Sequence, residues 1–200
     1  MIVEKPKLLI IAGPNGSGKT TVTNEILKHA WRKDCEYINP DVIAQEKFGD
    51  WNSDNAVLKA ANFSQELRYK LLENKSGIVF ETVLSSEEKL LFIKKAKAQE
   101  YFIRLFFIGT DSPEINAARV AKRVIEGGHT VPITKIISRY RKSIINCAAI
   151  VSELDRLYVY DNSIENKEAK LLFRANNGKI VKKYCEINDW AKIIFNQLEK

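Results

Sequence analysis

The sequence predicts an α/β fold in which a parallel five-stranded sheet is flanked by helices and followed by a β-hairpin and a C-terminal helix. Short apolar segments alternate with longer amphipathic ones through the first 163 residues, which is typical of parallel strands joined by helical crossovers. A glycine-rich turn connects the first apolar segment to a helical one. No repeat or long linker interrupts this pattern, so we expect one domain over residues 1–200, with its core at about 7–163 and the hairpin and helix at 170–198.

Five apolar segments are the expected strands. Residues 8–12 read as a buried parallel strand. The second strand, at 36–39, should end at Asn39-Pro40, because the residue before a proline favours extended backbone. The other three strands are expected at 77–80, 101–108 and 157–160.

Capping residues and prolines mark the expected helices. Ser53 or Asp54 caps a helix that reaches residue 74, and Ser85-Ser86-Glu87-Glu88 forms a capping box. Prolines at the first helical position open two more helices, and the hairpin should turn at a glycine-containing sequence. These elements are a helix from Pro113 to Gly127-Gly128, a helix from Pro132 to about Leu154, a hairpin at 170–184 about Asn176-Asn177-Gly178, and a final helix at 189–198.

Residues 13–20 fit the phosphate-loop pattern G-x-x-x-x-G-K-[ST] at every fixed position. Glycines let the backbone curl around an anion at the N-terminus of the following helix, where N–H groups and the helix dipole favour negative charge. Lys19 adds a mobile charge for the outer phosphates, and Thr20 offers a hydroxyl to Mg²⁺. We therefore expect ATP and Mg²⁺ as cofactors, with the nucleotide bound by Gly13, Pro14, Asn15, Gly16, Ser17, Gly18, Lys19, Thr20 and Thr21.

Composition narrows the class of protein. The three cysteines are widely separated and lack C-x-x-C spacing, so neither a disulfide framework nor a zinc site is indicated. The first strand begins too early to leave room for a signal peptide, and no apolar run is long enough for a membrane span. We expect a cytoplasmic protein. The net charge of +7 comes from lysines spread over many expected helix faces, so nucleic acid is not expected as the main partner.

Carboxylates near the strand ends are candidates for chemistry on a phosphate acceptor. Asp41 lies 22 residues after Lys19, where it could take a proton from an acceptor hydroxyl; the alternative is a turn-forming Pro-Asp pair. Glu81 directly follows an apolar strand, where a carboxylate is costly unless it is paired or exposed at the site. In the functional interpretation it is a substrate ligand or lies in the outer shell of Mg²⁺. The alternative is a strand-end glutamate in solvent. Thr82 and Ser85 could add hydroxyls to the acceptor pocket, although Ser85 is also a candidate helix cap.

Carboxyl ends of parallel strands meet at one edge of a sheet, where ligands bind. We therefore expect the polar residues that follow four strands, Asp41, Glu81, Asp111 and Asp161, to face one crevice.

Arginines on both sides of Gly127-Gly128 indicate a lid. Arginine is planar, permanently charged and bidentate toward phosphate, so a closing lid would neutralise charge that develops during phosphoryl transfer. Arg123 and Arg139 are the expected catalytic members, while Arg119 and His129 are expected substrate contacts. The alternatives are a solvated charged face for each arginine and a loop-packing or capping role for His129.

Together these motifs resemble the zeta toxin family and its zeta-like relatives, which are P-loop kinases whose characterised members phosphorylate UDP-N-acetylglucosamine. The resemblance covers roughly residues 7 to 163. It rests on four segments: 13–20, Asn39-Pro40-Asp41, Phe80-Glu81-Thr82, and Arg123 through Gly127-Gly128-His129-Thr130-Val131-Pro132 to Arg139-Tyr140.

The resemblance implies that Lys19 and Thr20 bind phosphate and Mg²⁺, that Asp41 is the base, and that Arg123 and Arg139 stabilise charge. The sequence departs from the family at the acceptor pocket. In the family, the pocket sequence is similar to Glu-x-Thr-x-Arg. In this chain Thr82 follows Glu81 directly, and the next arginine is Arg104. No antitoxin-like segment is fused to the chain, so the resemblance suggests a separate antitoxin protein.

We therefore expect an ATP-dependent small-molecule kinase that transfers the γ-phosphate to a hydroxyl of a metabolite, with a sugar nucleotide such as UDP-N-acetylglucosamine implied by the resemblance. Two alternatives stay open. One is a nucleotide-driven regulatory ATPase or switch. The other is a polynucleotide-end kinase, which the charge of +7 favours weakly.

Overall fold

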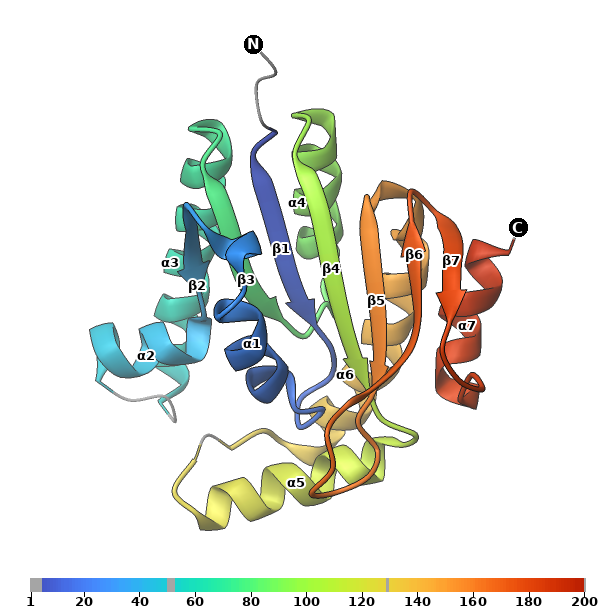
Figure 1. Cartoon of the computed structure of the whole chain (residues 1–200). Helices are drawn as coiled ribbons and strands as arrows, with labels where there is room; N and C mark the ends of the chain where they lie inside the picture. The colour runs from blue at the N-terminus through green and yellow to red at the C-terminus, as the bar shows by residue number, and fades with distance from the viewer. Residues whose placement is uncertain (1–4, 50–52, 129, 200) are drawn as a thin grey trace.

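The computed structural model describes residues 5–49, 53–128 and 130–199, and these form a central sheet with helices on both faces (Figure 1). The strand order is β2-β3-β1-β4-β5-β6-β7. The strands are β1 (Lys7–Ala12), β2 (Cys35–Ile38), β3 (Gly77–Thr82), β4 (Phe102–Gly109), β5 (Arg156–Asp161), β6 (Lys170–Asn176) and β7 (Lys179–Lys183). The helices are α1 (Lys19–Leu27), α2 (Pro40–Phe48), α3 (Asp54–Glu73), α4 (Glu87–Ala98), α5 (Pro113–Ile125), α6 (Ile133–Ala149) and α7 (Asp189–Leu198), with short 3₁₀ helices at Ala30–Arg32 and Val151–Glu153.

The first five strands are parallel, as the alternation of apolar and helical segments predicts. β1 lies at the centre, between β3 and β4, and most of its side chains are fully buried. Because crossover helices cover both faces of this half of the sheet, its central strand reads as a continuous apolar run. The expected α/β class is confirmed.

The sheet has seven strands among the described residues, so the expected five-stranded sheet with an appended hairpin is wrong at one edge. β6 pairs antiparallel with β5, and β7 pairs with β6 across a turn at Asn177 and Gly178, both of which have positive φ. The physical reason is that β5 would otherwise end the sheet with unpaired backbone groups. Leu172, Phe173 and Ala175 of the hairpin extend the apolar core beyond β5.

The helices are unevenly divided between the two faces. Figure 1 shows α1 in front of the central strands, with α3, α4, α6 and α7 behind the sheet. The larger core cluster lies on the side of those four helices and includes Leu72, Phe92, Ile144 and Ile194. A second cluster packs Ile26 of α1 against β1, β3 and β4. On the α1 side, no helix of the described residues lies over β5 to β7 (Figure 1).

Most expected helix boundaries are confirmed, with three corrections. α2 begins directly at Pro40, where the sequence predicted only a strand end, because the Asn39 side chain accepts the N–H of Asp41 (2.9 Å) and caps the helix. The predicted capping box at 85–88 is wrong: Ser86 is the N-cap of α4 and makes no side-chain capping bond. α6 ends at Ala149, and a 3₁₀ turn carries the chain toward Leu154. No helix in the described ranges is long and apolar enough to cross a membrane.

Candidate active site

The phosphate loop joins β1 to α1 in a conformation that requires glycine. Gly16 and Gly18 have φ of 78° and 88°, in the left-handed region that side chains rarely adopt. A Cβ atom on Gly16 would lie 2.5 Å from the backbone oxygen of Asn116. Gly13, with φ of 150°, approaches the Ile108 oxygen so closely that a Cβ would lie 2.1 Å from it. The loop is therefore a tight backbone cradle.

Two asparagines from distant parts of the chain hold the loop. Asn116 of α5 donates from Nδ2 to the Asn15 oxygen (2.6 Å). Asn162, which follows β5, donates from Nδ2 to the Ser17 oxygen (2.9 Å). Sequence reasoning missed both residues, because they act across more than 100 positions of the chain. Ser17 Oγ and Asn15 Oδ1 are buried without a hydrogen-bond partner among the described residues, which fits a loop built to receive a polar ligand.

Lys19 lies in the first turn of α1, and its Nζ donates to the Pro14 oxygen (2.9 Å). Burial lowers the pKa of the Lys19 ammonium to about 8 from its ordinary value of 10.5. The negative charges of Glu81 and Asp41 act against this lowering, and the positive charges of Arg123 and Arg139 add to it. The four residues expected around the γ-phosphate, two carboxylates and two lid arginines, thus act electrostatically on the same ammonium.

Glu81 is 8% exposed at the end of β3, so the interpretation of a solvent-facing strand-end glutamate is wrong. Its Oε1 accepts a hydrogen bond from the Tyr37 hydroxyl (2.5 Å), which in turn accepts one from Asn39 Nδ2 (3.1 Å). Burial and the neighbouring Glu81 carboxylate raise the pKa of Tyr37. Sequence reasoning missed Tyr37. Its register with Val79, two residues before Glu81, puts both side chains on one face of the sheet.

Asp41 is exposed in the first turn of α2. Asn39 links it to the buried pair, because the Asn39 side chain accepts the Asp41 N–H and donates to the Tyr37 hydroxyl. A single hydrogen-bonded chain therefore runs from the start of α2 through Asn39 and Tyr37 to Glu81. The Asp41 carboxylate at the α2 end of this chain is open to solvent.

Thr82 and Ser85 lie in the turn between β3 and α4. Thr82 Oγ1 accepts the Leu84 N–H (3.0 Å), and the Thr82 oxygen accepts the Gly13 N–H (3.2 Å). Thr82 therefore braces the phosphate loop from β3. Ser85 is half-buried and precedes the N-cap of α4. Contact of either hydroxyl with an acceptor stays a prediction.

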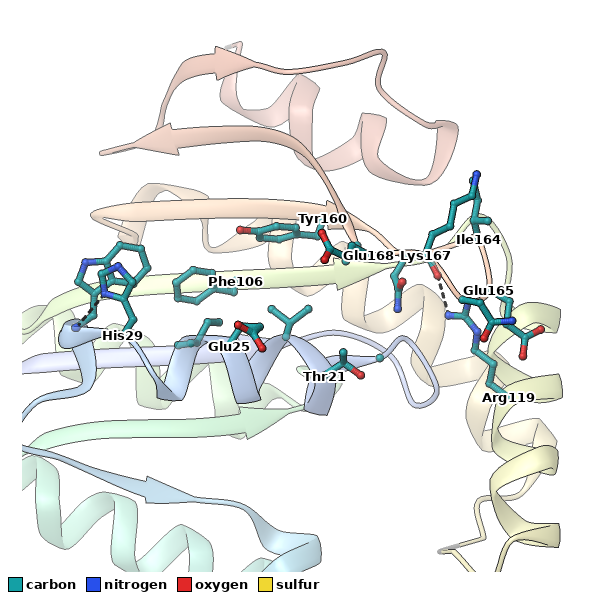
Figure 2. A pocket seen from close by; sticks show the side chains of 17 residues that line it. Thr21, Glu25, His29, Phe106, Arg119, Tyr160, Ile164, Glu165, Lys167 and Glu168 are labelled. Carbon is teal, nitrogen blue, oxygen red and sulfur yellow. Dashed lines mark hydrogen bonds between the residues drawn. The ribbon is translucent and has the colours of Figure 1, made fainter.

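Arg119 lies apart from the charges around Lys19. Its guanidinium donates to the backbone oxygens of Asn162 (2.7 Å) and Ser163 (3.4 Å). Figure 2 shows it reaching from α5 to the segment that follows β5. His129, the other expected substrate contact of the lid, lies outside the described residues.

Asp111 and Asp161, which the sequence places at strand ends like Asp41 and Glu81, are bonded to other parts of the chain. Asp161 Oδ1 accepts hydrogen bonds from Trp190 Nε1 (3.1 Å) and Ser163 Oγ (2.6 Å). Asp111 Oδ1 accepts one from Asn188 Nδ2 (2.7 Å). Both carboxylates are used to dock the C-terminal segment on the end of the sheet.

A groove of about 780 Å³ runs along α1 beside the phosphate loop. Gly18 and Thr21 line its loop end, Arg119 and Asn162 one wall, and Phe106 and Tyr160 the sheet side (Figure 2). Its volume is in the range of small-molecule sites. Thr20 and Thr21 are both exposed at the start of α1, and no cluster of three or more metal-ligating side chains occurs in the described residues.

Comparison with known proteins identifies relatives of this architecture. A family model described as Zeta toxin matches residues 2–177. An uncharacterized protein of Haemophilus influenzae is 30% identical over 141 residues, which is 70% of this chain and 94% of that protein.

Two solved structures share the fold. One, from the PezAT chromosomal toxin-antitoxin system of Streptococcus pneumoniae, has a TM-score of 0.64 at 16% identity, covering 98% of this chain and 85% of that one. Another, AvrRxo1-ORF1:AvrRxo1-ORF2 with ATP, has a TM-score of 0.68 at 18% identity and covers 97% of this chain. This chain spans 64% of the length of that second structure.

Proposed function

This chain is a member of the zeta toxin family, and from that premise we propose that it is an ATP-dependent kinase acting on a hydroxyl of a small metabolite. The observation that carries the proposal is the environment of Lys19. Two carboxylates and two arginines from separate elements act on its ammonium beside the phosphate loop. Phosphoryl transfer needs this combination, because it depends on positioning and on neutralising charge at the γ-phosphate.

The residues take distinct roles in this proposal. The loop backbone at 13–18 and the Lys19 ammonium bind the phosphates of ATP. Asp41, exposed at the start of α2, accepts the proton of the attacking hydroxyl. Arg123 and Arg139 neutralise charge that develops on the transferred group.

The exposed Thr20 hydroxyl at the start of α1 would be the protein ligand of Mg²⁺, and Glu81 would contribute to its outer shell. Mg²⁺ is commonly held by one or two protein groups together with substrate phosphates, so a dedicated cage of side chains is not required. When bound, it supplies positive charge to the phosphates.

The groove along α1 suits the nucleoside of ATP. It opens beside Gly18 and Thr21, and it is walled by Phe106 and Tyr160 on one side and by Arg119 on the other. The AvrRxo1-ORF1:AvrRxo1-ORF2 structure, which has the same fold, was solved with ATP. We therefore assign Arg119 to the nucleoside side of the site, in place of the acceptor side.

For the acceptor, the family resemblance supports a sugar nucleotide such as UDP-N-acetylglucosamine. The pocket lacks the arginine expected shortly after Glu81, and Tyr37 is bonded to Glu81 instead. The PezAT structure belongs to a toxin-antitoxin system, which supports a separate antitoxin protein as partner.

The test is to incubate the protein with γ-labelled ATP and a metabolite extract, then identify the compound that acquires phosphate. Asp41→Asn should abolish transfer to this acceptor while retaining ATP binding, because the carboxylate is needed only for the proton. Full turnover by Asp41→Asn would remove Asp41 as the base.

Two other outcomes would redirect the assignment. ATP turnover that requires a macromolecular partner would favour the regulatory ATPase. Label on polynucleotide 5′ ends would favour the end kinase.

A further inference from the structure

The α1 side of strands β5 to β7 is a sheet face that no helix covers among the described residues. Over β4, this side is partly covered by α1 and by Trp31 of the 3₁₀ helix at 30–32. Figure 1 shows β4, β5 and β6 in front, with α4 and α6 behind them and α1 displaced toward β1 and β3. Side chains on this face alternate with those buried against α4, α6 and α7. The register of the strands therefore determines which side chains lie next to one another on this face.

Register gathers cations and aromatic rings on this face. Arg104 of β4 pairs with Arg156 of β5, in one row across the sheet. In the next row, Phe106 pairs with Tyr158, Tyr158 with Arg174 of β6, and Arg174 with Lys182 of β7. We call the set formed by Arg104, Arg156, Arg174, Lys182, Tyr158 and Tyr160 the basic-aromatic face.

The four cations of the basic-aromatic face have no acidic partner in the described part of the chain, where none of them forms an ion pair. Nε of Arg104 and Nε of Arg174 are buried without a hydrogen-bond partner there. The Asp155 carboxylate is bound by Lys97, and Arg156 donates to the Asp155 backbone oxygen (2.7 Å) and not to its side chain. An uncompensated row of positive charge attracts a polyanion.

The rings of this face are arranged for stacking. Phe106 and Tyr158 lie 5.0 Å apart between ring centroids at an interplanar angle of 15°. Trp31 stacks on Phe106 at 5.9 Å, and the Arg104 guanidinium lies 3.8 Å from the Trp31 ring centroid. At the other edge, Lys182 lies 4.8 Å from the ring of Tyr184. Phe106 itself is buried, so the rings of this face that are partly open are those of Tyr158 and Tyr160.

We propose that the basic-aromatic face binds a single-stranded nucleic acid. Phosphates would lie against the arginines and Lys182, while exposed bases stack on Tyr158 and Tyr160, which is how sequence-tolerant single-strand sites are built. The cations lie on strands and none lies on a helix that could enter a major groove, so we take a single strand as the occupant. An acidic protein segment would form ion pairs with the cations but would offer no planar group to stack on the aromatic rings.

This face is distinct from the groove along α1, although Phe106 and Tyr160 border both. The groove is lined by both charges, Glu25, Glu165 and Glu168 with Arg119 and Lys167 (Figure 2), and Glu25 and Glu165 are paired with Lys28 and Lys122. The basic-aromatic face carries no such acidic groups among its six residues. The four cations come from four separate strands, so the sequence shows no basic tract at this face.

The experiment measures fluorescence anisotropy of a labelled 12-nucleotide single strand of mixed sequence, as RNA and as DNA, with the full chain. Arg156→Gln combined with Arg174→Gln should weaken binding at least tenfold. The plot of log affinity against log salt should become shallower by about 1.4, because each phosphate contact contributes about 0.7 for single strands.

The matched control is Lys70→Gln combined with Lys94→Gln, which removes the same charge from exposed positions on α3 and α4, behind the sheet. It should change affinity less than twofold. Tyr158→Leu, which keeps every charge, should weaken binding at least fivefold through lost stacking. Unchanged ATP binding confirms that each variant is folded.

Binding of either single strand, with these losses, supports the proposal, and the two strands show whether the 2′-hydroxyl contributes. Three results would overturn it: no binding by the wild-type chain, equal loss in the control pair, or a duplex of the same sequence bound as tightly. Competition by a polyglutamate peptide as strong as by the unlabelled strand would assign the face to an acidic protein instead.

Discussion

At the scale of single residues, Lys19 is where the phosphate loop meets the charges of Glu81, Asp41, Arg123 and Arg139. Its ammonium is desolvated by the folded chain, and the charges of Glu81 and Asp41 only partly restore its protonated form. Asp41, Glu81, Arg123 and Arg139 could be predicted because each lies in a local pattern, at a strand end or beside the Gly-Gly turn. Tyr37 could not, since its bond to Glu81 joins residues 44 positions apart.

The lowered pKa of Lys19 predicts a pH dependence of ATP affinity. Below pH 8 the ammonium is charged and attracts phosphate; above its pKa of about 8 that charge is lost. Affinity should therefore fall by up to about tenfold between pH 7 and pH 9, since one unit above a pKa leaves about a tenth of the group charged. Titration with a fluorescent ATP analogue across this range measures it.

Lys19→Arg is the control, because a guanidinium stays charged throughout. Its affinity should be weaker in absolute terms but nearly flat with pH. The same slope in both proteins would assign the dependence to another group.

At the scale of elements, the phosphate loop and its flanking strand and helix were predictable because a fixed motif specifies them. The start of α2 at Pro40 was not, since the same Asn-Pro-Asp sequence suits a turn, and only Asn39 capping distinguishes the two. The capping-box pattern at 85–88 failed for the opposite reason: the sequence matched, but the Ser86 side chain makes no capping bond.

Comparison of Gly16 with Gly49 distinguishes the effect of backbone strain from the effect of steric contact. Gly16 and Gly49 have nearly the same φ, 78° and 77°. A Cβ on Gly16 would meet the Asn116 backbone, whereas one on Gly49 would meet nothing within 4 Å. Gly16→Ala should therefore abolish ATP binding and destabilise the fold by more than the roughly 1 kcal/mol expected of Gly49→Ala. Thermal melting and ATP titration of both variants measure the difference, and equal effects would contradict the steric account.

At the scale of the whole molecule, the alternation of strand and helix predicted the parallel half of the sheet, while the C-terminal edge depended on long-range pairing. Nothing local in residues 170–184 says that the hairpin joins β5, because that depends on the unpaired edge it covers. Asp111 and Asp161 likewise lie at strand ends, as Asp41 and Glu81 do. Only their hydrogen bonds to residues 188–190 show that they hold the C-terminal segment in place.

That docking gives a prediction about how α7 supports the nucleotide site. Trp190 is 8% exposed, bonds to Asp161 and fills the space against Gly109, where a Cβ would lie 2.3 Å from its ring. Asp161 directly precedes Asn162, which holds the phosphate loop at Ser17. Trp190→Ala should therefore lower the unfolding free energy by about 3–5 kcal/mol and also weaken ATP binding.

The control is Ile193→Ala, at an exposed position of the same helix. It should lower the unfolding free energy by less than about 1 kcal/mol and leave ATP affinity unchanged. Urea denaturation and ATP titration test both effects, and a Trp190→Ala protein that loses stability but binds ATP normally would show that the C-terminal helix stabilises the sheet without positioning the loop.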